Sequence, residues 1–264
     1  MRSLCRTSLL VFVVAIAFVA ASAQPEKQTK TLPFTNGEVL TYEGKISRLA
    51  ISISIADVTF SADQVPDSTN YRIHAKATSK GTLLRLFRFS FLQDYESIVD
   101  FQNQRVIKTT KHDVQKERIR DSIADFDYTQ KRVSYTESDP NDANRPPRRI
   151  ASKIVEPMYD LVTGIYSIRA MSLSVGKSFD VSLSDSGLVY EVPVRVTKRE
   201  QQKTIFGKVW CWRIEPAVFG PGRLIEQKGS MIIWLTDDDR KIPVRSQLNT
   251  TYGKVDIRLK SATK

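Results

Sequence analysis

Few side chains in the sequence are of the types that hold metals or perform nucleophilic catalysis. The histidines are His74 and His112, and the cysteines are Cys5 and Cys211. Two Cys and two His so far apart do not make a disulfide framework or a zinc site. The acidic run Asp237–Asp239 lacks the Gly and Glu of a calcium loop and is typical of a hairpin turn. Since nucleophile, phosphate-loop and zinc-protease motifs are also missing, the sequence predicts no catalytic residue, metal or cofactor.

The stretch Gly81–Leu92 is the most apolar segment of the chain after its amino-terminal region, and it contains two arginines. As a binding site, it would line a groove for an acyl chain, with the arginines near an anionic head group. As structure, its three alternate phenylalanines would be core residues of one strand, which is the interpretation that period-two aromatics favour. The candidate ligand contacts are Leu84, Arg85, Phe87, Arg88, Phe89, Phe91 and the more distant Trp234.

One segment has the spacing of an amphipathic helix. Apolar residues recur at helical intervals from Met158 to Ile168, after Pro157 at a first-turn position and before Gly176. Arg169 falls in the middle of the apolar stripe, so it either reaches water at the rim or is buried against a carboxylate. The sharper hypothesis is a buried structural pair of Arg169 with Asp94 or Glu96.

Most of the remaining chain alternates apolar and polar residues with the period of a half-buried strand. Examples are Tyr71–Ala77, Phe179–Leu183 and Val255–Leu259, and a change of phase predicts a bulge near Ile55–Ala56. The run Met231–Leu235 is apolar on both faces, as in a central strand. The sequence therefore predicts a mainly β fold, an antiparallel curved sheet or partial barrel with one packed helix. Two smaller halves are the alternative.

The amino terminus has the pattern of a secretory signal. Arg2 and Arg6 precede an apolar run from Leu9 to Ala20, and Ala21–Ala23 supplies the small residues of a cleavage site. The run is shorter than the roughly 18 residues that a membrane span needs. The expected organisation is a signal peptide at 1–23, a disordered leader at 24–33 and a single β-rich domain at 34–260.

Charge and compartment limit the partners. Cleavage removes Cys5, which leaves Cys211 as an expected buried thiol, and it lowers the net charge of +11 by two. A basic exported protein without a lipid-attachment cysteine at the cleavage point is expected to be periplasmic or extracellular and not lipid-anchored. Its expected partners are a lipid or an anionic envelope component, with peripheral membrane contact. Nucleic acid is not expected, because no recognition helix or RNA-binding motif is present, and the oligomeric state stays open.

Several stretches, taken in order, resemble the bacterial family called domain of unknown function 3108. They are Gly37–Tyr42, Gln93–Ser97, Tyr159–Arg169 with Gly176, Arg199–Glu200, and Ile233–Asp238 leading to Ile242–Arg245. The resemblance covers roughly residues 34–259 and departs at Ala50–Ile51, where a glycine-containing stretch is expected. It implies an exported, β-rich protein with no assigned activity. The carboxy-terminal hairpin also looks like those of periplasmic lipoprotein and lipid carriers, whose half-open barrels hold acyl chains over a helix.

These observations favour a non-enzymatic exported protein that binds a lipid or other amphipathic ligand in a β-rich groove. A structural or assembly partner of envelope proteins or glycans is the first alternative. A hydrolase of an envelope polymer is the second, because two carboxylates that meet only in space leave no sequence motif.

Overall fold

The computed structural model describes residues 32–48, 51–251 and 253–263. The predicted signal peptide and residues 24–31 of the predicted leader lie outside these ranges. The first strands and the first helix are β1 Glu38–Arg48, β2 Ile51–Gln64, β3 Tyr71–Ser79, α1 Gly81–Phe87, β4 Phe91–Asp100, β5 Arg105–Gln115, β6 Arg118–Asp127, β7 Arg132–Ser138 and β8 Arg148–Lys153. Then follow β9 Met158–Asp160, α2 Leu161–Arg169, β10 Ser178–Asp185, β11 Leu188–Thr204, β12 Gly207–Pro216, β13 Gly229–Thr236, β14 Pro243–Thr250 and β15 Gly253–Thr263.

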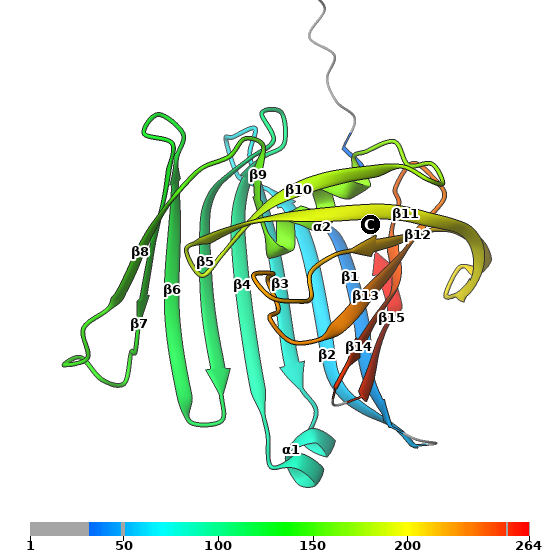
Figure 1. The fold of residues 1–264 in the computed structure, drawn as a ribbon, viewed down its shortest axis with the longest axis horizontal. Coiled ribbons are helices and arrows are strands. Elements are labelled where there is room, and N and C mark those ends of the chain that lie inside the picture. The colour runs from blue at the N-terminus through cyan, green and yellow to red at the C-terminus, as the bar shows by residue number, and fades with distance from the viewer. Residues whose placement is uncertain (1–31, 49–50, 252, 264) are drawn as a thin grey trace, which may run out of the picture. The chain divides into compact units, whose positions relative to one another are not determined.

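All fifteen strands belong to one sheet, and twelve of them close into a ring (Figure 1). The order around the ring is β4-β3-β2-β1-β15-β14-β13-β12-β11-β10-β9-β5, and β4 pairs with β5 to complete it. Neighbours are antiparallel except at β9, which runs parallel to β10 and to β5. The sheet branches at β5, since β6, β7 and β8 continue from it outside the ring. The predicted mainly β class is confirmed, and the barrel is closed where the sequence predicted a curved sheet or partial barrel.

The alternation of the sequence fixes which side chains face inward. In β10, Val181 and Leu183 are buried, while Phe179 packs against the same core. In β2, the residue Ile55 has no partner on β1, because Gly44 pairs with Ala56 and Lys45 with Ser54. This is the predicted bulge, and the Ile55 carbonyl accepts a hydrogen bond from the backbone nitrogen of Lys80 instead.

The predicted helix begins later than its apolar spacing suggested. Met158–Asp160 form the short strand β9, and α2 starts only at Leu161. Asp160 is the N-cap, and its side chain accepts hydrogen bonds from the backbone nitrogens of Val162 and Thr163. A capping aspartate therefore sets the start, and Pro157 precedes β9 rather than occupying the first turn.

The helix α2 lies inside the ring of strands (Figure 1). Its buried apolar residues Val162, Tyr166 and Ile168 belong to the main hydrophobic core together with residues of the surrounding strands. A helix of nine residues is marginal by itself. Packing against the barrel wall must therefore supply most of its stability.

Candidate ligand-binding cavity inside the barrel

The barrel interior next to α2 contains a cavity of about 370 Å³. Its wall is formed by β1, β2, β10–β15 and α2, and the side chains along it are almost all apolar. Representative lining residues are Phe60, Ile165, Val181, Val194, Ile233 and Ile257. Among the described residues, no Asp or Glu side chain lines this cavity. Sites for small molecules typically have volumes of about 300–1,000 Å³ and mostly apolar linings. The volume and the lining of this cavity fit a small apolar or amphipathic ligand.

A buried carboxylate holds α2 in place against the barrel wall. Asp160 is 1% exposed, and one of its oxygens, Oδ2, accepts hydrogen bonds from Ser97 of β4 and from Thr109 of β5, the latter at 2.8 Å. Its other oxygen, Oδ1, caps the helix through the backbone nitrogens of Val162 at 3.0 Å and Thr163 at 2.8 Å. Because the same carboxylate ties the cap to two wall strands, α2 cannot shift along the barrel without breaking these bonds.

A glycine lets α2 approach the wall strand β10 closely. A Cβ atom built on Gly164 would lie 2.7 Å from Cδ2 of Leu183 on β10. This distance is shorter than the normal contact between two nonbonded carbon atoms. Leu183 itself lines the cavity. The helix and β10 therefore meet at Gly164, and the space that remains beside them is the cavity.

The amino-terminal strand and the end of α2 are joined by a buried ion pair. Arg169 donates from Nη1 to Oε1 of Glu38 at 2.7 Å and from Nη2 to Oε2 at 2.9 Å. It also donates to the backbone carbonyls of Pro33 at 2.9 Å and Arg240 at 3.0 Å. These bonds use four of the five N–H groups of a guanidinium. Burial alone would lower the pKa of Arg169, but the Glu38 carboxylate more than compensates, so the pKa of the guanidinium is raised.

Two phenols complete a polar end of the otherwise apolar cavity. Tyr42, Tyr166 and Arg169 all line it, and the Tyr166 ring lies 5.0 Å from the guanidinium carbon of Arg169. The Tyr166 hydroxyl is buried and has no hydrogen-bond partner among the described residues. Burial raises the pKa of both tyrosines, which keeps their hydroxyls protonated and able to donate. This end therefore offers hydrogen-bond donors to a polar group.

The predicted burial of Arg169 against a carboxylate is confirmed, but the predicted partners are wrong. Asp94 pairs with His74 at 2.5 Å and with Lys76 at 3.7 Å, and Glu96 pairs with Arg72 at 3.3 Å. On β4 the inward positions are those of the buried Tyr95 and Ser97, so the two acids point to the opposite face. Glu38 was missed, although it lies in phase with the buried Leu40 and Tyr42 on β1.

The predicted ligand contacts of the 81–92 segment do not line the cavity. Residues 81–87 form α1 rather than part of one strand, and β4 begins only at Phe91. The side chains of Leu84, Arg85 and Arg88 are exposed, and Phe89 and Phe91 contact each other with ring centroids 6.3 Å apart. The side chain of Phe87 lies outside the described part. The helix forms because Leu83 is buried, while Thr82 donates to the carbonyl of Ser54 in β2.

Trp234, the remaining predicted contact, lies on the other face of β13 from the cavity-lining Ile233. It packs in a second core cluster, and its indole nitrogen donates to Glu200 at 2.6 Å. The same cluster contains Cys211, which is fully buried as predicted. Burial raises the pKa of the Cys211 thiol to about 12, so it is an inert packing residue at neutral pH.

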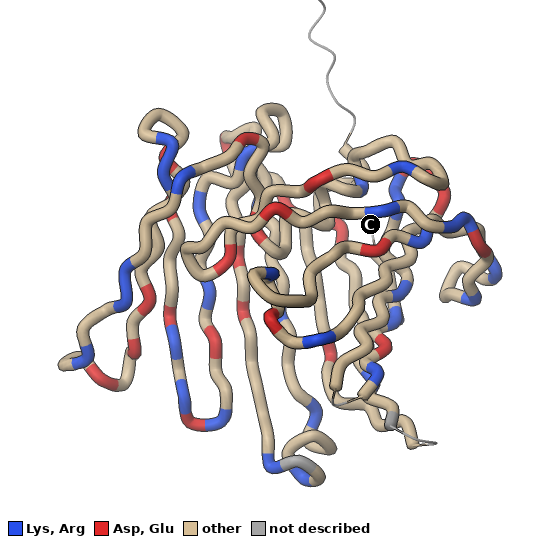
Figure 2. Tube along the Cα trace, viewed as in Figure 1, with Lys and Arg blue, Asp and Glu red and all other residues tan. Residues whose placement is uncertain are grey.

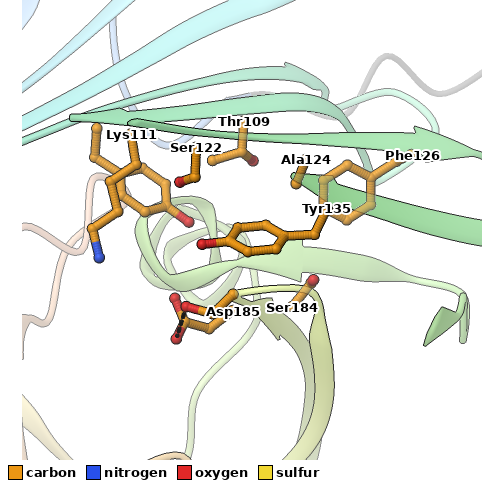
Figure 3. A pocket seen from close by; sticks show the side chains of 10 residues that line it. Thr109, Lys111, Ser122, Ala124, Phe126, Tyr135, Ser184 and Asp185 are labelled. Carbon is orange, nitrogen blue, oxygen red and sulfur yellow. Dashed lines mark hydrogen bonds between the residues drawn. The ribbon is translucent and has the colours of Figure 1, made fainter. Parts of the chain in front are cut away.

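A smaller pocket lies where β10 faces the β5–β7 branch of the sheet (Figure 3). Tyr95, Tyr135, Ser122 and Asp185 are among its lining residues, and its volume is about 20 Å³. This is room for one water molecule. The pocket therefore does not form a ligand site of its own.

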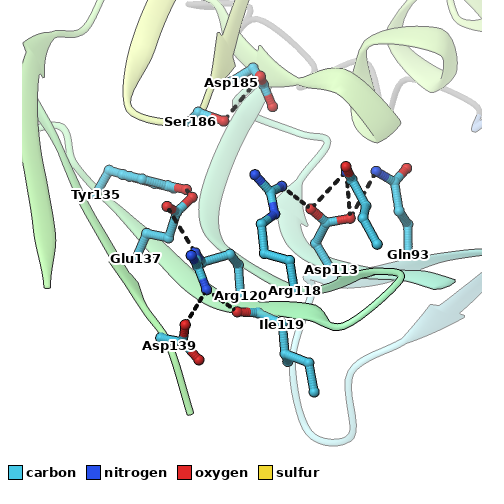
Figure 4. Close-up of polar contacts among 11 residues, drawn as sticks. Gln93, Asp113, Arg118, Ile119, Arg120, Tyr135, Glu137, Asp139, Asp185 and Ser186 are labelled. Atoms are coloured by element: carbon cyan, nitrogen blue, oxygen red, sulfur yellow. Dashed lines mark hydrogen bonds and ion pairs between the residues drawn. The ribbon is translucent and has the colours of Figure 1, made fainter. Parts of the chain in front are cut away.

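Several charged side chains nearby are paired with one another (Figure 4). Asp113 accepts from Arg118 at 3.0 Å and from Gln93 at 3.2 Å, and Arg120 pairs with Asp139. The two histidines lie on the outer face of the sheet, where His112 contacts Asp121 at 2.6 Å. Within the described ranges, no group of three His, Cys, Asp or Glu residues is arranged to hold a metal ion.

One comparison with a solved structure supports the architecture. A solved β-barrel-like protein of domain of unknown function 1849 from Brucella abortus matches with a TM-score of 0.60 at 10% identity, covering 86% of this chain and 97% of that one. A candidate exported protein with a YmcC-like fold from Bacteroides fragilis matches with a TM-score of 0.34 at 11% identity, covering 88% and 98%. A hypothetical protein from Chlamydia trachomatis matches with a TM-score of 0.31 at 9% identity, covering 87% of each chain.

The first of these similarities shows a shared β-barrel-like fold and nothing about activity. No curated protein matches the chain. A family model matches residues 40–260, which include nearly all of the barrel. The chain therefore belongs to the DUF3108 family of proteins of unknown function.

Proposed function

We propose that this protein binds an amphipathic ligand inside the barrel, with the apolar part in the cavity and a polar group at Tyr42, Tyr166 and Arg169. The observation that carries the proposal is the apolar cavity of about 370 Å³ between α2 and the barrel wall. Each methylene group that leaves water for such a site gains about 0.8 kcal/mol. The signal-peptide pattern of residues 1–23 supports an exported protein, for which envelope lipids are the available amphiphiles.

The polar end favours an uncharged head group that accepts hydrogen bonds. The charge of Arg169 is already balanced by Glu38 at 2.7 Å. An additional carboxylate in this buried place would lack a counter-charge, which is costly. A carbonyl or ester oxygen, by contrast, can accept from the unpaired Tyr166 hydroxyl without adding a charge. A monoacylglycerol is therefore expected to bind more tightly than the free fatty acid anion of the same chain.

Ligand access is expected along the half-buried part of the cavity lining. Met231, Leu248 and Ile257 line the cavity, yet they are only partly buried. The residues near the ion pair, such as Leu40 and Ile168, are buried. A ligand entering past the half-buried residues would place its polar group deepest and its chain toward the opening.

The test combines native mass spectrometry of the gently purified protein with a binding titration of a long-chain monoacylglycerol. Ile257→Trp fills the cavity from its half-buried side and is expected to weaken binding about tenfold or more. Ile123→Trp makes the same exchange at a 43% exposed position on β6 and should leave affinity unchanged. Two results together would refute the proposal: native mass spectra that show only ligand-free protein, and a titration that shows no saturable binding of the monoacylglycerol.

A further inference from the structure

A hairpin arm extends from the barrel wall between β11 and β12. In β11, pairing with β10 ends at Arg195, and in β12, pairing with β13 begins only at Cys211. Residues 198–210, here called the arm, are therefore a two-stranded ribbon that pairs with itself through the turn after Thr204. The yellow ribbon that curls away from the barrel in Figure 1 is this arm.

One face of the arm is bound to the outside of the barrel. Glu200 accepts a hydrogen bond from the indole nitrogen of Trp234 on β13 at 2.6 Å. Gln202 accepts from Arg245 of β14 at 3.4 Å. Val209 packs against the buried cluster that contains Trp234. These contacts fix the orientation of the arm, so its opposite face must point away from these partners.

The opposite face combines an exposed aromatic residue with cations. In the ribbon register Lys203 faces Lys208 and Gln201 faces Trp210, so these four residues share one face. Trp210 is 46% exposed, and the guanidinium of Arg199 lies 4.5 Å from its ring centroid. Tryptophan side chains are highly buried on average in folded proteins, so this exposed fraction is unusual.

The tip of the arm is apolar and exposed. Ile205 and Phe206 form the turn, and they are 45% and 39% exposed. Arg240, from the turn after β13, lies 5.8 Å from the Phe206 ring. The arm carries four basic residues, Lys198, Arg199, Lys203 and Lys208, of which Arg199 pairs with Asp237 at 2.6 Å, and its one acid, Glu200, is turned to the barrel. Figure 2 shows Lys and Arg recurring along this hairpin.

We propose that the tip and the basic face of the arm dock the protein onto an anionic lipid bilayer. Tryptophan and phenylalanine are favoured at the depth of the lipid head groups, while Lys and Arg beside them are attracted to anionic lipids. The arm presents both, on a ribbon whose other face is held by Trp234 and Arg245. Among the described residues, no helix is long and apolar enough to cross a membrane. This proposal stands on the arm alone and does not depend on what the cavity binds.

Co-sedimentation of the protein with vesicles tests the docking. Binding is expected with phosphatidylcholine vesicles that contain phosphatidylglycerol, and it should weaken as salt rises or as phosphatidylglycerol is left out. The variant Lys203→Gln/Lys208→Gln should lower the partition constant about tenfold or more. Lys108→Gln/Lys153→Gln removes two exposed cations from β5 and β8 and should leave binding nearly unchanged.

A second readout separates insertion from simple charge attraction. The tryptophan emission should shift to shorter wavelength on vesicles, and Trp210→Phe should remove most of that shift. Phe206→Ser should lower binding while the unfolding midpoint stays as in the wild type, because Phe206 is exposed at a turn. No binding to phosphatidylglycerol vesicles at low salt would overturn the proposal. Binding to soluble polyglutamate that is as tight as binding to the vesicles, without an emission shift, would overturn the proposal in favour of an acidic protein partner.

Discussion

Arg169 and Glu38 form a two-point ion pair between residues that are 131 positions apart in the chain. Their side chains are 1% and 5% exposed, and the two N···O distances are 2.7 and 2.9 Å. The pair connects the end of α2 to the start of β1, so it fixes the helix within the closed barrel. It also places a balanced charge beside the polar end of the cavity.

Arg169→Met is expected to lower the free energy of unfolding by about 3–5 kcal/mol, because Glu38 would remain buried without its counter-charge. Urea unfolding monitored by circular dichroism measures the loss. Arg72→Met is the control, since Arg72 pairs with Glu96 where the side chains are 45% and 41% exposed, and it should cost less than about 1 kcal/mol. The double variant Glu38→Met/Arg169→Met should recover part of the loss. Equal costs for the two single arginine variants would contradict the buried pair.

Local periodicity was sufficient to predict several strands but not their partners. The alternation of β10 and the change of phase at Ile55 gave a correct inward face and a correct bulge. The closure of the barrel depends on β9, which has three residues and pairs in parallel with strands far away in sequence. Such pairing leaves no periodic signal.

The sequence predicted the apolar helix and its buried arginine, but it did not predict which other residues form the candidate site. The apolar helix and its buried arginine were visible in the sequence, but the partner of Arg169 depends on which strand passes α2. The segment 81–92 was assigned to a ligand groove or a core strand because it is apolar. Its helix α1 instead leaves Leu84 52% exposed and Leu86 54% exposed, and composition alone cannot distinguish these outcomes.

Asp160→Ala is expected to destabilise the protein by about 2–4 kcal/mol, because it removes a helix cap and leaves buried hydroxyl and amide donors without an acceptor. Asp160→Asn keeps one capping oxygen and should cost less. Asp127→Ala is the matched control, since its side chain accepts from the backbone nitrogen of Gln130 in an exposed turn at 2.8 Å. Thermal unfolding of the three variants measures the order of their stabilities. A loss of stability for Asp160→Ala no larger than that for Asp127→Ala would refute the anchoring role.

Gly187→Ala and Gly207→Ala separate backbone strain from packing. Both glycines have a left-handed φ, +80° at Gly187 and +86° at Gly207, so both substitutions impose similar strain. A Cβ on Gly187 would lie 2.6 Å from Cβ of Tyr135 and 2.9 Å from Cβ of Ile150, whereas Gly207 has nothing within 4 Å. Gly187→Ala should therefore cost about 1–3 kcal/mol more in urea unfolding. Equal costs would mean that the β10–β11 turn does not pack tightly against β7 and β8.

Glu43 is expected to make stability depend on pH in the acid range. A hydrogen bond from Ser54 at 2.7 Å and the nearby ammonium groups of Lys80 and Lys45 lower the pKa of Glu43 to about 2. A carboxyl whose pKa is lower in the folded than in the unfolded chain stabilises the folded state above its ordinary pKa, which is 4.5 for Glu43. That stabilisation is lost as the pH falls toward 2.

Glu43→Gln should therefore cost about 1 kcal/mol at pH 7, a modest value because the surrounding lysines are open to solvent and salt. The difference from the wild type should shrink between pH 4.5 and pH 2, because Glu43 becomes protonated first in the unfolded and then in the folded chain over this interval. About 1 M NaCl should shrink it at pH 7, since screening then acts within a few ångströms. Glu117→Gln, at an exposed turn position, should change stability at neither pH. A cost of Glu43→Gln that is the same at pH 7 and pH 2 would show that the carboxylate charge does not contribute to folding.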